Sequence, residues 1–168
     1  MPHNLELVPV QTDVQIVTTA SLAQEIWSDH YVGIISQAQI DYMLARLQSA
    51  AAIAEQLQKG NEYFLLYRDA ELVGYAAVKV ELSQRRLFIS KLYLRRALRR
   101  QGLGRAALQH LAALARQRDL PTLWLTVNKR NSALTAYLRV GFVIVADVII
   151  DIGNGYVMDD YQLEWTRF

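Results

Sequence analysis

The chain has 168 residues, no cysteine and a formal net charge of +2 at pH 7, with 18 Lys and Arg against 16 Asp and Glu. This length fits one domain, and the absence of cysteine excludes a disulfide framework, a thiol nucleophile and cysteine-type zinc ligation. No apolar run is long enough to span a bilayer, and the first residues lack the pattern of a signal peptide. We therefore expect a cytoplasmic protein with no membrane partner.

The first third of the chain is predicted to be mainly helical. Leu5–Val10 alternates apolar and polar residues, which is typical of a short strand. Thr12 is placed to cap a helix that reaches about residue 29, and residues 30–35 form a loop-like break. Ser36 is then placed to cap a second helix, which runs, by itself or with a continuation, to Gly60.

Beyond Gly60 the apolar pattern changes to that of strands. Tyr63–Tyr67 and Leu72–Val80 are predicted to form a hairpin, and Leu87–Leu94 a third strand. Helices are then expected at 104–117 and 132–140, with strands at 123–127, 142–150 and 157–165. No repeat or linker divides the chain, so the pattern predicts one mixed α/β domain over residues 1–168, with a right-handed strand–helix–strand crossover at its centre.

The most informative segment is Arg99-Arg100-Gln101-Gly102-Leu103-Gly104-Arg105-Ala106, between the third strand and a predicted helix. Two glycines let the backbone turn tightly and expose consecutive N–H groups, and a helix beginning there adds its positive end, which suits a pyrophosphate. An ordinary strand-to-helix turn is the alternative. A dinucleotide-binding loop would need glycine where Ala107 stands, and no Gly-Lys-Ser/Thr of a P-loop is present.

A second block follows about twenty-five residues later, with Leu123–Val127, Asn131, Tyr137 and Gly141-Phe142. Together the two blocks resemble the GNAT superfamily of N-acetyltransferases, whose Arg/Gln-x-x-Gly-x-Gly/Ala signature is matched at residues 99–104. The resemblance covers roughly Phe64 to the C-terminus. It implies an α/β (α+β) GNAT fold, in which a mixed, mostly antiparallel sheet of six to seven strands is flanked by about four helices.

The resemblance also implies acetyl-CoA as co-substrate, with no metal. In this family the strand before the glycine loop pairs with the pantetheine arm, the loop amides hold the pyrophosphate, and an asparagine contacts the pantetheine amides. The cofactor-binding residues carried over in this way are Leu92, Tyr93, Leu94, Arg99, Arg100, Gln101, Gly102, Leu103, Gly104, Arg105, Asn131 and Tyr137. Asn131 also suits a turn or a helix start, and the two roles are compatible.

Ten basic residues lie between Arg85 and Arg118, and they admit two interpretations. Clustered arginines could neutralise the phosphates of a nucleic acid. The three phosphate groups of one CoA molecule would also need a local basic patch and nothing more. Because no RNA- or DNA-reading motif is present, we expect no nucleic-acid partner.

Acetyl transfer needs a neutral amine, a donor for the oxyanion and a proton for the departing thiolate. By resemblance Tyr137 protonates the thiolate, although spacing alone would also suit a core aromatic. The backbone N–H of Tyr93 or Leu94 would stabilise the oxyanion. The strand before the loop carries no carboxylate, so the candidate base is Glu81, acting through water, with a water chain to bulk solvent as the alternative.

The acceptor side is less well defined by the sequence. Segments 26–31, 39–44 and 152–161 resemble a bacterial subgroup that includes the spermine/spermidine acetyltransferases. Asp159 and Asp160 alternate in direction on a strand, so one of them could face a cleft and attract an amine, or both could be solvated or paired with arginines. His30 and Tyr31 fall in the loop where acceptors enter in this family. The three histidines are too scattered for a metal site.

The sequence therefore predicts direct acetyl transfer from acetyl-CoA to a primary amine, with a small molecule such as a polyamine as the first candidate. One alternative is acetylation of a protein or peptide amine, at an N-terminus or a lysine. A second is a non-catalytic acetyl-CoA sensor. A homodimer is plausible because the C-terminal strands are apolar.

Overall fold

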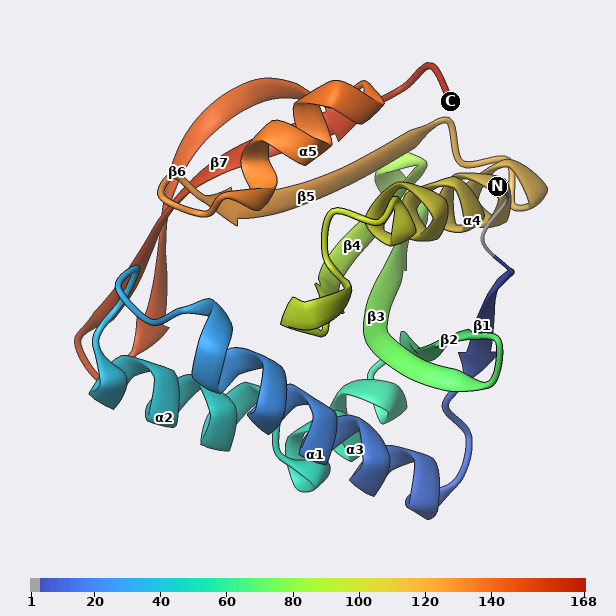
Figure 1. Cartoon of the computed structure of the whole chain (residues 1–168). Helices are drawn as coiled ribbons and strands as arrows, with labels where there is room; N and C mark the ends of the chain where they lie inside the picture. The colour runs from blue at the N-terminus through green and yellow to red at the C-terminus, as the bar shows by residue number, and fades with distance from the viewer. Residues whose placement is uncertain (1–3) are drawn as a thin grey trace.

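The computed structural model describes residues 4–168 and contains one seven-stranded sheet with helices on both faces (Figure 1). This confirms the predicted mixed α/β fold. The strands are β1 (Leu5–Pro9), β2 (Asn61–Arg68), β3 (Glu71–Glu81), β4 (Arg86–Leu94), β5 (Thr122–Asn128), β6 (Val143–Gly153) and β7 (Tyr156–Trp165). The helices are α1 (Asp13–His30), α2 (Gln37–Leu47), α3 (Ala50–Gln58), α4 (Leu103–Gln117) and α5 (Ala133–Val140).

Polar caps fix the N-terminal helices. Thr12 and Gln15 form a reciprocal capping box at the start of α1, and the Ser36 hydroxyl accepts from the Gln39 N–H (3.1 Å) at the start of α2. The predicted continuation to Gly60 is a separate helix, because the chain leaves helical geometry after α2 and the Ser49 hydroxyl begins α3 by accepting from the Ala52 N–H (3.2 Å).

The strand order is β1-β2-β3-β4-β5-β7-β6, and all neighbours are antiparallel except β4 and β5. That parallel pair is joined only between Arg86–Phe88 and Thr122–Trp124, although both strands continue beyond it. Figure 1 shows the two strands diverging from this junction. The sheet is therefore open along the free edges of β4 and β5.

A bulge in β4 decides which face its residues occupy. Val78 pairs with Ile89 and Ala77 with Lys91, so Ser90 is the extra residue. Before the bulge Leu87 and Ile89 belong to the core under α4, whereas after it the alternation is reversed. The bulge thereby turns Lys91 and Tyr93 toward the α1–α3 face.

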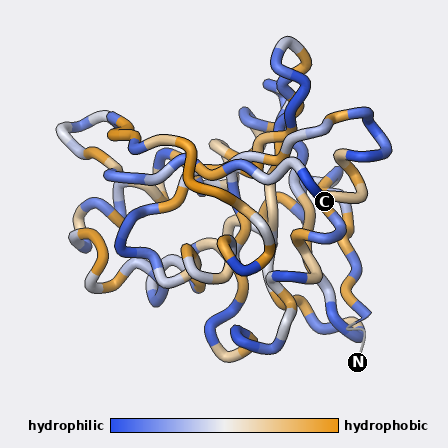
Figure 2. Tube along the Cα trace, turned by 90° about the horizontal axis from the view of Figure 1, so that it is seen from above, coloured by the Kyte–Doolittle hydropathy of each residue, from blue (hydrophilic) through white to orange (hydrophobic). Residues whose placement is uncertain are grey.

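Two apolar clusters hold the layers together. One packs the buried stripe of α4, including Leu103, Leu108 and Leu111, against the sheet. The other packs α1–α3 against the opposite face, with Trp27 and Tyr75 at its centre. Figure 2 shows hydrophilic residues gathered in the outer loops, and within residues 4–168 no helix is long and apolar enough to cross a membrane.

The β6–β7 hairpin reaches across to the helices below the sheet (Figure 1). The Tyr42 hydroxyl donates to the Ile152 carbonyl (2.9 Å), and the Gln39 amide donates to the Val157 carbonyl (3.0 Å). From the β5–α5 turn, the Arg130 guanidinium donates to two carbonyls of the α1–α2 loop, those of residues 33 and 34 (2.6 and 3.0 Å). These bonds fix the α1–α2 loop beside the opening in the sheet.

Candidate functional site

A cavity of about 960 Å³ lies where β4 and β5 separate, between the glycine loop, the start of α5 and the end of α1. Most of the predicted site residues line it. These are His30, Tyr31, Leu92, Tyr93, Leu94, Arg99, Arg100, Gly102, Gly104, Arg105, Asn131 and Tyr137. The structure thus brings together segments that are about a hundred residues apart in sequence.

The other predicted site residues are not on the lining. Leu103 is 1% exposed and packs in the core under α4, and the Gln101 side chain accepts from Arg68 (2.7 Å). Glu81 sits at the far end of β3, where it accepts from Trp124 Nε1 (2.9 Å) and pairs with Arg86 (2.5 Å). Glu81 is therefore held by local partners away from the cavity, and its predicted role as a base through water stays untested.

Glycine geometry builds the end of the cavity at which the sequence predicts that the cofactor binds, called the cofactor end below. Gly102 has φ 79° at the N-cap of α4, a left-handed conformation that favours glycine, and the first turn of the 15-residue helix follows directly. The free N–H groups of this turn face a lining that includes Arg99, Arg100 and Arg105. No Asp or Glu is on the lining within the described part of the chain. The chemistry of this end fits a phosphorylated ligand.

The free edge of β4 supplies the middle of the cavity. Leu92, Tyr93 and Leu94 pair with β3 on one side, but β5 has already diverged on the other. Backbone groups on such an edge can bond an extended ligand as an added strand would. Gly74 opposite Leu94 allows this close packing, because a Cβ there would overlap the Tyr93 carbonyl oxygen.

Tyr137 lies on α5 with its ring on the cavity and packed edge-on against Phe142, at 5.6 Å between centroids. Burial raises the pKa of Tyr137 above its usual range, so the hydroxyl stays protonated at neutral pH. A protonated phenol on the cavity wall can donate its hydrogen to a ligand atom. The Tyr137 ring therefore packs against the core, as its spacing predicts, and also lines the cavity, as the resemblance predicts.

Asn131 links the start of α5 to the end of α1. Its Oδ1 accepts from the Ala133 N–H (2.9 Å), which leaves its amide to donate to His30 Nε2 at 3.1 Å. Burial, with a smaller contribution from Arg99, lowers the pKa of His30 to about 4, so the ring is neutral and can accept. Asn131 therefore has the predicted helix-start role while its side chain also faces the cavity.

Aromatic side chains form the end of the cavity at which the resemblance predicts that the acceptor enters, called the acceptor end below. The Tyr31 and Tyr93 hydroxyls are 3.0 Å apart, and the Trp27 ring lies 4.6 Å from Tyr31 and 5.3 Å from Tyr93 between centroids. Burial raises the pKa of Tyr31 to about 12. The acceptor end is thus closely packed and largely apolar, and its neighbouring charged groups are Lys91 and Asp160.

Lys91 is a lining residue that the sequence interpretation missed. Its ammonium donates to Gln56 Oε1 (2.5 Å) and to the Tyr63 hydroxyl, and burial lowers its pKa to about 7. A lysine in the middle of an apolar strand was the available signal. The signal could not be interpreted because the bulge at Ser90, which sets the direction of Lys91, comes from pairing with β3.

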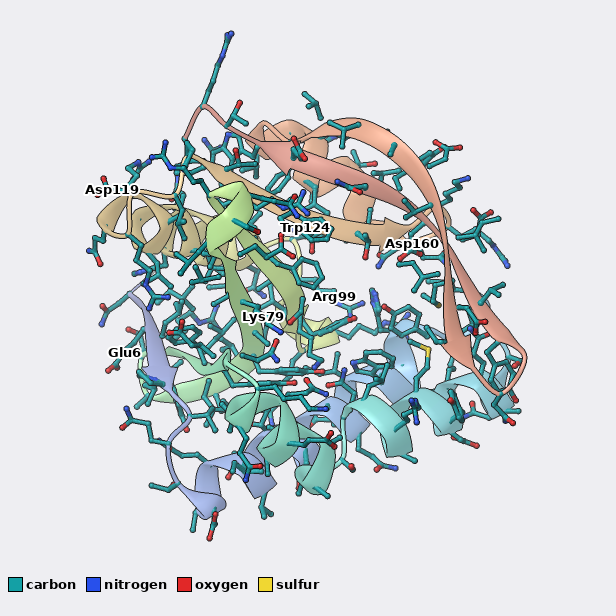
Figure 3. The ribbon with its side chains drawn as sticks, turned by 180° about the vertical axis from the view of Figure 1, so that it is seen from behind. Glu6, Lys79, Arg99, Asp119, Trp124 and Asp160 are labelled. Atoms are coloured by element: carbon teal, nitrogen blue, oxygen red, sulfur yellow. The ribbon has the colours of Figure 1, made fainter. Side chains whose placement is uncertain are left out.

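The two C-terminal aspartates point to opposite sides, as the strand alternation predicts. Asp159 is exposed and its carboxylate lies 2.9 Å from the Lys129 ammonium. Asp160 is 5% exposed, and within residues 4–168 its Oδ1 has no hydrogen-bond partner. Burial raises the pKa of Asp160 to about 6 against a smaller opposing effect of a Thr126 hydrogen bond. Figure 3 labels Asp160 on β7 and Arg99 at the glycine loop.

Two curated relatives match parts of the chain. It is 39% identical over 75 residues to the streptothricin acetyltransferase of Streptomyces lavendulae, which covers 44% of this chain and 40% of that protein. It is 36% identical over 87 residues to the ribosomal protein bS18-alanine N-acetyltransferase of Escherichia coli strain K12, which covers 50% of this chain and 57% of that protein. The chain spans about half the length of these relatives.

A solved structure extends the likeness to the whole fold. The PaiA N-acetyltransferase of Thermoplasma acidophilum, in complex with coenzyme A, superposes with a TM-score of 0.79 over 97% of this chain and 99% of that one, at 18% identity. At that identity the likeness shows a shared fold. The family match itself extends over residues 20–142, which is most of the chain. The chain therefore belongs to the acetyltransferase (GNAT) family.

Proposed function

We propose that this protein transfers an acetyl group from acetyl-CoA directly to a primary amine. One observation carries the proposal: a protonated tyrosine, Tyr137, lies on the same cavity as a glycine loop suited to a pyrophosphate. The amides of residues 99–105 would hold the pyrophosphate, and the free edge of β4 would hold the pantetheine arm. The thioester would then lie between Tyr137 and the aromatic acceptor end.

In this arrangement a backbone N–H of β4, at Tyr93 or Leu94, stabilises the oxyanion that forms when the amine attacks the thioester carbonyl. Tyr137 donates its hydrogen to the sulfur as the C–S bond breaks. The protein has no cysteine that could carry the acetyl group, so the amine attacks the thioester itself. Holding the amine and the thioester in the orientation for attack contributes much of the expected increase in reaction rate.

A small amine is the acceptor class that we favour over a protein chain. The Arg130 bonds to the α1–α2 loop narrow the acceptor end, whereas a protein substrate needs an open groove. The sequence predicts a polyamine as the first candidate within this class, whereas the lining favours a simpler amine. The absence of carboxylates from the described lining favours an acceptor with a single ammonium group, because each further buried cation would need its own partner.

Substitution of Tyr137 tests the proposal. Tyr137→Phe keeps the ring and its packing, so the affinity for acetyl-CoA should be unchanged in calorimetric titration. The turnover, measured as thiol release in the presence of an amine panel, should fall at least tenfold because the proton donor is lost. Tyr67→Phe, a change outside the cavity lining, is the matched control. Unchanged turnover in Tyr137→Phe would remove Tyr137 from the mechanism.

A non-catalytic acetyl-CoA sensor is the competing function. It predicts acetyl-CoA binding by the wild type without amine-dependent thiol release from any member of the panel. The same titration and assay therefore separate the two functions.

A further inference from the structure

The described lining carries no carboxylate, yet among residues 4–168 one carboxylate with an unpartnered oxygen is buried next to lining residues. Asp160 belongs to β7, opposite Asn128 of β5, and its side chain points to the same face of the sheet as the acceptor end. Its Oδ1 is buried without a partner among residues 4–168, which is costly for a charged oxygen unless a ligand or water satisfies it. A carboxylate oxygen buried at this cost is a candidate functional group.

Two lining residues place Asp160 at the acceptor end. Thr126 lies on β5 close enough to lower the pKa of Asp160, and Tyr31 lies close enough for the two groups to affect each other electrostatically. Both Thr126 and Tyr31 face the cavity. Asp160 therefore lies next to two side chains that face the cavity.

We propose that Asp160 is the general base that takes a proton from the acceptor ammonium. This inference rests on the proposed function and assigns the base to a carboxylate, a group that β4 does not carry. It also gives the two neighbouring aspartates different roles, because Asp159 points to solvent and is paired with Lys129.

The protons balance in this scheme. The acceptor enters as an ammonium and gives one proton to the Asp160 carboxylate, directly or through one water. The neutral nitrogen forms the C–N bond with the thioester carbonyl carbon, and the C–S bond breaks as the sulfur takes a proton from Tyr137. The nitrogen then loses a second proton, which restores Tyr137 through water, and Asp160 releases its own proton to solvent. The products are the N-acetyl amine, CoA thiol and one proton.

The surroundings suit a base that works near neutral pH. The titratable groups that act on Asp160 are Tyr31, directly after α1, Lys129 from the turn after β5 and the neighbouring Asp159, whose side chain lies on the other side of β7. Burial dominates over these charges and raises the pKa of Asp160 to about 6. At pH 7 the carboxylate is mostly ionised and yet basic enough to accept a proton.

The pH dependence of kcat/KM for the best acceptor of the amine panel tests this role. In the wild type kcat/KM should rise to a plateau above about pH 6. In Asp160→Asn only the free amine reacts, so kcat/KM should keep rising with pH toward the pKa of the acceptor itself. At pH 7 the variant should be slower by about 10²–10⁴-fold. Asp159→Asn, the matched control, should keep the wild-type profile.

A second acceptor distinguishes a base from a residue that only positions the amine. A fluorinated amine of similar size, which is already neutral at the assay pH, needs no base. The defect of Asp160→Asn should then shrink at least tenfold. An equal defect with both amines, or an unchanged pH profile, would overturn the assignment while the wild type remains active. Absence of turnover in the wild type despite acetyl-CoA binding would overturn the proposed function and this inference with it.

Discussion

The two ends of the cavity are built on different principles. The cofactor end comes from one continuous segment, β4 and the glycine loop, and it offers mainly backbone groups and exposed arginines. The acceptor end is assembled from α1, β4, β5 and β7, and it offers buried side chains with shifted pKa values, among them Lys91 and Asp160. A backbone site tolerates many side-chain changes, whereas a site of buried side chains depends on each of them.

This difference predicts where substitutions act. At the cofactor end, changes that move the backbone should be the most harmful, and changes to single arginines should be mild. At the acceptor end, removal of a buried charge should stabilise the fold, because a buried charge without an opposite charge costs desolvation free energy.

Gly74→Ala should cause the largest loss of stability. Its Cβ would overlap the Tyr93 carbonyl oxygen and lie 2.9 Å from Leu94 Cδ2, so β4 must shift. We expect the free energy of unfolding in urea to fall by about 1–3 kcal/mol, with weaker acetyl-CoA binding. Gly104→Ala is the control, because its Cβ would meet Leu94 at an ordinary 3.7 Å and should leave stability unchanged or slightly higher. Equal stability of the two variants would contradict a backbone-built cofactor end.

Lys91→Met should raise stability at pH 7 by about 1–2 kcal/mol, since it replaces a buried, unpaired charge with an apolar chain. The Tyr63 hydroxyl still donates to Gln56 (2.6 Å), so no buried polar group is left alone. Because burial lowers the pKa of Lys91 to about 7, wild-type stability should rise between pH 7 and the normal lysine pKa. The advantage of the variant should therefore shrink at pH 10. A pH-independent difference would show that packing is the cause.

Arg105→Gln should weaken acetyl-CoA binding about five- to tenfold, because one exposed charge-assisted contact to phosphate contributes about 1 kcal/mol. The salt dependence of the dissociation constant should also decrease. Arg116→Gln, at the other end of α4, should leave both quantities unchanged. A loss of a thousandfold or more would mean that side chains and not loop amides dominate the cofactor end.

Asp160→Asn should raise the melting temperature at pH 7.5 by a few degrees, the smallest effect expected. The pKa of Asp160 is higher in the folded chain than in the unfolded chain, so the folded carboxylate is destabilised at high pH and relieved as pH falls below about 6. The difference between variant and wild type should thus disappear near pH 4. A lower melting temperature for the variant at pH 7.5 would identify Asp160 as a structural residue.

Contiguous signals made the cofactor end predictable. The glycine spacing, the strand before it and Tyr137 in the short helix after β5 could be interpreted locally, and the cavity contains all three. The alternation of Asp159 and Asp160 was predictable as well. Which of them is buried was not, because that depends on the pairing of β7 with β5 and on the helices packed below.

Long-range pairing also explains the remaining differences. The direction of Lys91 depends on a bulge that exists only when β3 and β4 pair. Glu81 was predicted to act as a base through water because it lies close in sequence to the strand that precedes the glycine loop. In the structure its bonds to Arg86 and Trp124 hold it at the end of β3 that lies away from the cavity. The break between α2 and α3 could not be predicted, because a serine such as Ser49 can either cap a helix or stand inside one.

Direct acetyl transfer to a primary amine can be tested by measuring thiol release from acetyl-CoA across a panel of polyamines, diamines, monoamines, N-terminal peptides and lysine peptides, with product analysis by mass spectrometry. We expect amine-dependent thiol release matched one to one by an N-acetylated small amine. Measurable acetyl-CoA binding without amine-dependent thiol release from any member of the panel would contradict it.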